Sequence, residues 1–117
     1  MATRNTLAQV EGVSALFASI NVTDSSGTPA VTDTSILAHA PDITIADNGV
    51  GDYTLTLNPF RAPRGIAHAH ASSKTISNMA SVTAVTYTGS SLAVTVRNED
   101  DASAATDSGF YLQVWAF

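Results

Sequence analysis

The sequence contains no cysteine, a single lysine and few charged residues of either sign. Without cysteine, the chain forms neither a disulfide framework nor a thiolate metal site. Charged residues make up 13 % of the 117 residues, which is about half the share usual in a soluble domain. A neutral surface rich in Ser, Thr and Asn fits either a Thr-rich β-protein or a subunit packed among neighbours.

Basic residues are also scarce. The chain has 5 Lys and Arg residues against 10 Asp and Glu, with a net charge of −5. Binding to nucleic acid or to an anionic membrane requires a basic surface, so neither partner is expected. There is no apolar run of about 18 residues to span a bilayer. Residues 1–15 lack the apolar core of a secretory signal, which predicts synthesis and folding in a host cytoplasm.

Against this background, residues 110–117 stand out, because they hold the only tryptophan. Alternation along a strand places their side chains on two faces: Phe110, Leu112, Val114 and Ala116 on one, and Tyr111, Gln113, Trp115 and Phe117 on the other. Gln113 is the one polar residue among them. The pattern predicts a strand between two apolar layers, either inside a sandwich or between a sandwich and another subunit.

Period-two hydrophobic segments alternate with turn residues along the rest of the chain. A strand is expected over 14–22, ended by the turn residues 24–29, and another over 35–40. The clearest prediction is the hairpin 43–57, with the Asn-Gly pair at 48–49 as its type I′ turn. About eight such strands, with no amphipathic helix pattern, predict an all-β fold.

The expected architecture is an antiparallel, jelly-roll-like β-sandwich of about eight short strands. Residues 14–117 are predicted to form one domain, since the chain has room for one core. Residues 1–13 are polar without a clear period and are predicted to form an N-terminal arm.

Three segments of the second half carry a resemblance to a known family. They are GDYTLTLNP at 51–59, SLAVTVRN at 91–98 and GFYLQVWAF at 109–117, with an acidic loop before the last. The pattern, spread over residues 43–117, resembles the β-sandwich modules, related to the C1q-like jelly roll, of tailed-bacteriophage capsid decoration proteins, head fibres and tail appendages. The resemblance implies a homotrimer whose C-terminal strands lie near the threefold axis.

What the resemblance implies for function is a structural virion protein and no enzyme. A single small domain with a short arm favours a capsid decoration, or cement, protein, which binds the major capsid protein on the outer surface of the phage head and stabilises capsomer contacts. The alternative is a head-fibre or tail appendage module that recognises a host surface glycan. Such a module needs exposed aromatic side chains, for which the candidates are Tyr53, Phe60, Tyr87 and Trp115.

Two sets of residues are therefore assigned to interfaces. The predicted subunit interface consists of Tyr111, Gln113, Trp115 and Phe117. The predicted capsid contacts are Arg4 and Leu7 in the arm, and Arg61 and Arg64 in a proline-containing loop. Arginine suits such a contact because its guanidinium group pairs well with the carboxylates of a partner.

Catalytic and metal sites are not predicted. His68 and His70 lie two residues apart on an expected strand, and with His39 they could share zinc, but no neighbouring carboxylate supports them. The acidic residues 99–101 with Asp107 lack the spacing of an EF-hand. The sequence has no G-x-S-x-G motif and no constellation of nucleophile and base, so neither an enzyme nor a cofactor is expected.

Overall fold

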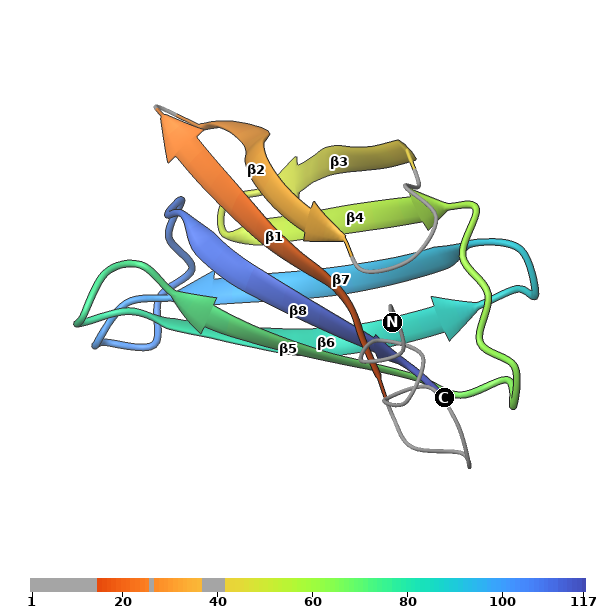
Figure 1. The fold of residues 1–117 in the computed structure, drawn as a ribbon. Helices are drawn as coiled ribbons and strands as arrows, with labels where there is room; N and C mark the ends of the chain where they lie inside the picture. The colour runs from red at the N-terminus through yellow and green to blue at the C-terminus, as the bar shows by residue number, and fades with distance from the viewer. Residues whose placement is uncertain (1–14, 26, 37–41) are drawn as a thin grey trace, which may run out of the picture.

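The computed structural model describes residues 15–25, 27–36 and 42–117, and these form eight strands in two four-stranded sheets (Figure 1). In chain order the strands are β1 (Ala15–Ser25), β2 (Thr28–Ile36), β3 (Asp42–Gly49), β4 (Asp52–Asn58), β5 (Ala67–Ser73), β6 (Met79–Tyr87), β7 (Leu92–Glu99) and β8 (Phe110–Ala116). No helix occurs among the described residues. The predicted antiparallel β-sandwich is confirmed, whereas the predicted arm lies outside the described residues.

The strand order is β2-β1-β8-β5 in one sheet and β3-β4-β7-β6 in the other, and all pairs are antiparallel. Three pairs join strands that are consecutive in the sequence: β1–β2, β3–β4 and β6–β7. The last strand, β8, is central, because it pairs with β1 on one side and β5 on the other. At the lateral edges the sheets approach each other, with β2 near β3 and β5 near β6.

The core lies between the sheets and follows the alternation of the central strands. The largest fully buried side chains are Tyr53, Phe60, Phe110, Ile20, Leu55, Leu57, Leu92, Leu112, Val22, Val94, Val96 and Val114. Edge-to-face contacts join the aromatic rings at one end, with centroids 4.7 Å apart for Phe17 and Phe60 and 5.6 Å apart for Phe60 and Tyr87. Burying each of these large apolar side chains stabilises the fold by about 1.5–3 kcal/mol.

The hairpin of β1 and β2 differs from the sequence prediction. Strand β1 continues to Ser25, which pairs with Thr28, so residues predicted as a long turn are mostly strand. Gly27, at φ 82°, supplies the positive φ that this two-residue connection needs. Pro29 is tolerated because β2 is an edge strand, where a missing donor costs no ladder bond. Of the strand expected at 35–40, residues 37–40 lie outside the described residues.

The hairpin of β3 and β4 is confirmed, but its turn is not at the Asn-Gly pair. Gly49 pairs with Asp52, so the two turn residues are Val50 and Gly51, and a bulge occurs between Asp47 and Gly49. Gly51 has φ 66°, and a Cβ atom there would lie 2.5 Å from the carbonyl oxygen of Asn98. Because backbone atoms of a neighbouring segment come this close to Gly51, the turn lies at residues 50–51, two residues after the Asn-Gly pair.

Candidate interaction face on the sheet of β1, β8 and β5

The outward side of β8 carries the residues predicted to form a subunit interface. We call Tyr111, Gln113 and Trp115, with Phe117 after the strand, the outer β8 face. Strand β8 alternates as predicted: Phe110, Leu112 and Val114 are fully buried, and the outward side chains are half-buried or exposed. Tyr111 is 46 % exposed, the largest exposure on this face. The outer β8 face is thus partly exposed to solvent, whereas the opposite face of the same strand packs in the core.

The neighbouring strands extend this face on both sides. On β5, His68 lies opposite Trp115, His70 opposite Gln113 and Ser72 opposite Tyr111. On β1, Ser19 lies opposite Gln113 and Asn21 opposite Tyr111. The outward positions of β8 and β5 therefore carry no carboxylate. The result is a nearly neutral surface of aromatic, imidazole, amide and hydroxyl groups.

Contacts between side chains order the outer β8 face at both ends. The rings of His68 and Trp115 lie with centroids 5.9 Å apart. At the other end, the ammonium group of Lys74 lies 5.2 Å from the centre of the Tyr111 ring and donates to Asn21 Oδ1. Such cation–π contacts contribute about 0.5–1 kcal/mol at exposed sites. The only lysine of the chain is thereby held against this face.

The loop between β4 and β5 holds Arg61 and Arg64, both exposed as predicted for contact residues. Its backbone is fixed: the amide of Phe60 donates to Ser90 O at 2.8 Å, and the amide of Arg64 donates to Phe117 O at 2.7 Å. The two guanidinium groups therefore extend from a rigid loop that adjoins the outer β8 face at Phe117. Arg4 and Leu7, the other predicted contacts, lie outside the described residues.

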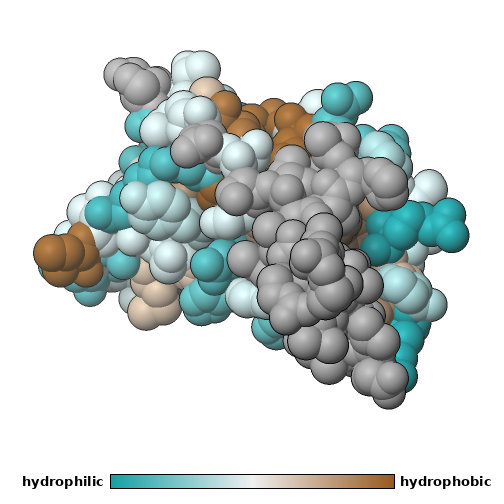
Figure 2. Space-filling model, viewed as in Figure 1, coloured by the Kyte–Doolittle hydropathy of each residue, from teal (hydrophilic) through white to brown (hydrophobic). Residues whose placement is uncertain are grey.

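The two ends of the sandwich differ in charge. Arg61 and Arg64 lie at the end where β4 leads into β5, whereas the turns after β1, β3, β5 and β7 gather at the opposite end (Figure 1). Most of the 10 acidic residues lie in those turns or at the strand ends beside them: Asp24, Asp47, Asp52, Glu99, Asp100, Asp101 and Asp107. The exposed side chains of Ile76, in the loop after β5, and Met79, at the start of β6, lie at the same end. Hydrophobic surface is visible at this tip in Figure 2. The two exposed arginines and most of the carboxylates therefore lie at opposite ends of the sandwich.

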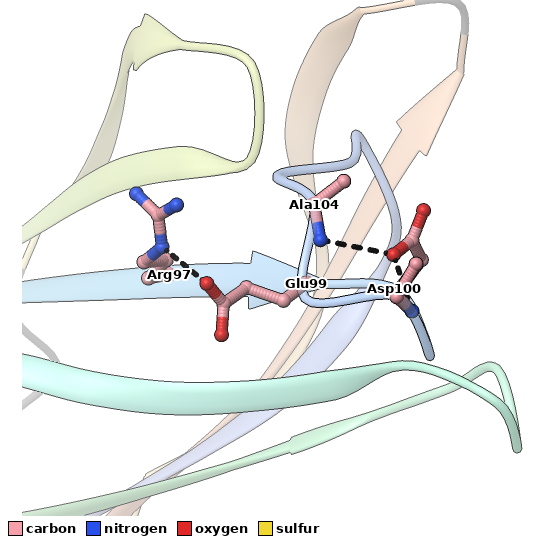
Figure 3. A network of polar contacts seen from close by, with 5 residues as sticks. Arg97, Glu99, Asp100 and Ala104 are labelled. Carbon is pink, nitrogen blue, oxygen red and sulfur yellow. Dashed lines mark hydrogen bonds and ion pairs between the residues drawn. The ribbon is translucent and has the colours of Figure 1, made fainter.

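The acidic loop after β7 is organised by its own backbone and one ion pair (Figure 3). Asp100 Oδ1 accepts hydrogen bonds from the amides of Ala102 at 2.9 Å and Ala104 at 3.0 Å. Glu99 pairs with Arg97 at 2.9 Å between Oε2 and Nε. These carboxylates are used as turn caps and as a surface ion pair, which is the role expected of carboxylates in turns.

A buried tyrosine joins three segments beneath this loop. The hydroxyl of Tyr53 donates to Asp24 Oδ2 at 2.5 Å and lies 3.3 Å from Asp107 Oδ1, while the amide of Ser108 donates to the hydroxyl oxygen. Burial, and then the hydrogen bond to Asp24, raise the pKa of Tyr53 far above its ordinary value. The phenol therefore stays protonated and links β4 to the end of β1 and to the loop before β8.

No metal-binding arrangement occurs in the described part of the chain, where no three His, Cys, Asp or Glu side chains are placed to share an ion. His68 and His70 are both exposed on one face of β5, as their spacing predicts, and His39 lies outside the described residues. Within the described ranges, no helix is long and apolar enough to cross a membrane.

The aromatic candidates for glycan binding are mostly in the core. Tyr53 is fully buried and Phe60 is 1 % exposed, so neither of these two candidates offers an exposed ring. Its ring packs against Phe17 and fills the space between the sheets. Tyr87 is half-buried, and its hydroxyl accepts from the amide of Ala62 and donates to Gly89 O. Trp115 alone of the four candidates belongs to the outer β8 face.

Sequence reasoning found the four residues of the outer β8 face but missed those beside them. Asn21 and Ser72 join it through pairing between strands that are distant in the sequence, and Lys74 through its contacts with Tyr111 and Asn21; no local signal exists for either. Comparison with protein-family models, curated proteins and solved structures finds no match to this chain. The case for its function therefore depends on these surfaces and on the sequence resemblance.

Proposed function

We propose that this chain is a structural virion protein, a homotrimeric decoration protein that binds the outer surface of a phage head. The observation that carries the proposal is the outer β8 face, where aromatic residues continue on the outside of a strand whose inner side is core. An aromatic, uncharged patch of this kind suits contact with another subunit.

The composition of the face favours a second copy of the same chain as the partner. Only residues that lie on a threefold axis meet their own equivalents, and carboxylates placed there would repel one another. The outward positions of β8 and β5 have none. If Gln113 or Ser72 lies at the axis, it can pair with its counterparts through hydrogen bonds, because amide and hydroxyl groups both donate and accept.

Such a trimer is stable if the burial of apolar surface outweighs the cost of association. Burial of apolar surface contributes about 25 cal/mol per Å². An interface that buries on the order of 1,000 Å² of apolar surface gives about 25 kcal/mol gross, against an association cost of about 4–15 kcal/mol. In this arrangement, Arg61 and Arg64 contact carboxylates of the major capsid protein, and one trimer bridges neighbouring capsomers.

The alternative, a head-fibre or tail appendage module that binds host glycan, has less support. A glycan platform needs exposed aromatic rings, and Tyr53 and Phe60 are in the core. Tyr111 and Trp115 remain available, but they are the residues with which the proposed trimer interface is built.

The test of the proposed function is to locate the chain on virus particles. Particles released by cells that encode this chain are imaged by electron microscopy with gold-labelled antibodies against it. Label distributed over the outer surface of the heads is the expected result. Label confined to tail tips or head fibres would support the appendage alternative, and particles without label would contradict both.

A further inference from the structure

Asn48 and Gly49 occupy an open position at the end of β3. Both residues are exposed, and Asn48 is the extra residue of the bulge between Asp47 and Gly49. Gly49 has φ 134°, and no atom lies within 4 Å of the place where a Cβ atom would be. The backbone at Gly49 is therefore open on the side where a side chain would be, and the Asn48 side chain beside it is exposed.

Two hydrogen bonds place polar groups at the atoms that a ring closure between the Asn48 side chain and the backbone nitrogen of Gly49 would involve. The amide of Gly49 donates to Asp47 Oδ1 at 3.1 Å, so a carboxylate contacts the nitrogen that would attack. The Asn48 Nδ2 group, which would leave, donates to Thr54 Oγ1 at 2.7 Å. A base within hydrogen-bond reach of the proton it removes is the first geometric requirement of general base catalysis.

We propose that Asn48-Gly49 is a self-modifying site, at which Asp47 assists the deamidation of Asn48. The Gly49 nitrogen gives up its proton to Asp47 and bonds to Asn48 Cγ, which closes a five-membered succinimide ring. The bond from Cγ to Nδ2 then breaks, and the nitrogen leaves as ammonia with the transferred proton. Water opens the ring at either carbonyl and yields aspartate or isoaspartate, so the net change is amide plus water to acid plus ammonia.

The modification changes the end of the sandwich at which the acidic turns gather. It adds one negative charge to a chain whose net charge is −5, beside Asp47 and close to Asp52. The isoaspartate product also lengthens the main chain by one carbon at the bulge. This inference is independent of the proposed role in a virion, because it concerns β3 and β4 of the opposite sheet.

The experiment follows the intact chain at mildly alkaline pH by mass spectrometry, with peptide fragmentation to locate each converted residue. We expect conversion at position 48 to be faster than at every other asparagine, and Asn48→Gln to abolish it. Asp47→Asn should slow conversion by about tenfold or more. The matched control is Asp52→Asn, which removes a carboxylate across the turn and should leave the rate unchanged.

Two results would overturn the inference. An intact Asn48 after other asparagines have converted would show that the site does not react. Equal rates in the parent chain and in Asp47→Asn would show that Asp47 is not the assisting base. Both substituted side chains are outside the core, at an exposed turn and its flank, and an unchanged melting temperature confirms that each variant is folded.

Discussion

A chain that ends after Gln113 should not fold. The truncation removes Val114, which is fully buried, and the half of β8 that pairs with β1 and β5. Because β8 is central, two neighbouring strands lose backbone partners at once, and unpaired buried peptide groups are costly. The combined loss exceeds the net stability of about 5–15 kcal/mol that a domain of this size has.

The measurement is far-UV circular dichroism with urea titration of the truncated and full chains. The truncated chain should lack a cooperative unfolding transition. Trp115→Ala is the matched control, because it removes the outward indole ring and leaves the backbone of β8 and the core side chains in place. A native spectrum and a cooperative transition in the truncated chain would contradict the central position of β8.

Tyr53→Phe should destabilise the fold by about 2–4 kcal/mol, because hydrogen bonds to charged groups contribute about 1.5–3 kcal/mol and their loss leaves a carboxylate unpaired. The substitution keeps the ring in the core, where it lies 5.4 Å from the Phe110 ring. It removes the hydroxyl that donates to Asp24. Asp24 Oδ1 is itself buried and has no hydrogen-bond partner among the described residues, so within that part of the chain the carboxylate depends on this donor.

The same hydroxyl gives the stability a dependence on alkaline pH. Burial raises the pKa of Tyr53 in the folded state, so above about pH 10 the unfolded chain binds fewer protons than the folded chain. The contribution of Tyr53 is therefore complete below about pH 10 and declines as the pH rises further. In Tyr53→Phe this alkaline decline should be smaller.

The measurement is the free energy of unfolding by urea as a function of pH. Tyr111→Phe is the matched control, since Tyr111 is 46 % exposed and its ring contacts Lys74 without need of the hydroxyl. It should change stability by less than about 0.5 kcal/mol. A Tyr53→Phe chain as stable as the parent would show that the Asp24 contact contributes nothing.

Sequence reasoning succeeds where alternation is uninterrupted. Strands β4, β7 and β8 keep a nearly strict period of two, and their buried residues are the apolar ones of that alternation. It fails at bulges, which shift the period by one residue. A bulge between Leu16 and Ala18 lets Phe17 join the core, although alternation groups it with Ser19 and Asn21. Nothing in the local sequence indicates these irregularities.

In the candidate site, too, some residues could be predicted from the sequence and others could not. The four residues of the outer β8 face follow from the pattern of one segment, so they were predictable. Their neighbours on β1 and β5 depend on which strands pair, and that order is decided by packing over the whole chain. The shifted turn at Val50-Gly51 has a similar cause, since backbone atoms of Asn98 and Thr106 fix the place of Gly51.

The central claim is that the outer β8 face joins copies of this chain, and sedimentation equilibrium tests it most directly. At micromolar concentration the full chain should have three times the mass of one 12.1 kDa chain. Trp115→Ala should lower that mass, whereas Thr95→Ala, on the outward side of the opposite sheet, should not. A full chain that sediments as a stable single copy, or a trimer unaffected by Trp115→Ala, would contradict the account.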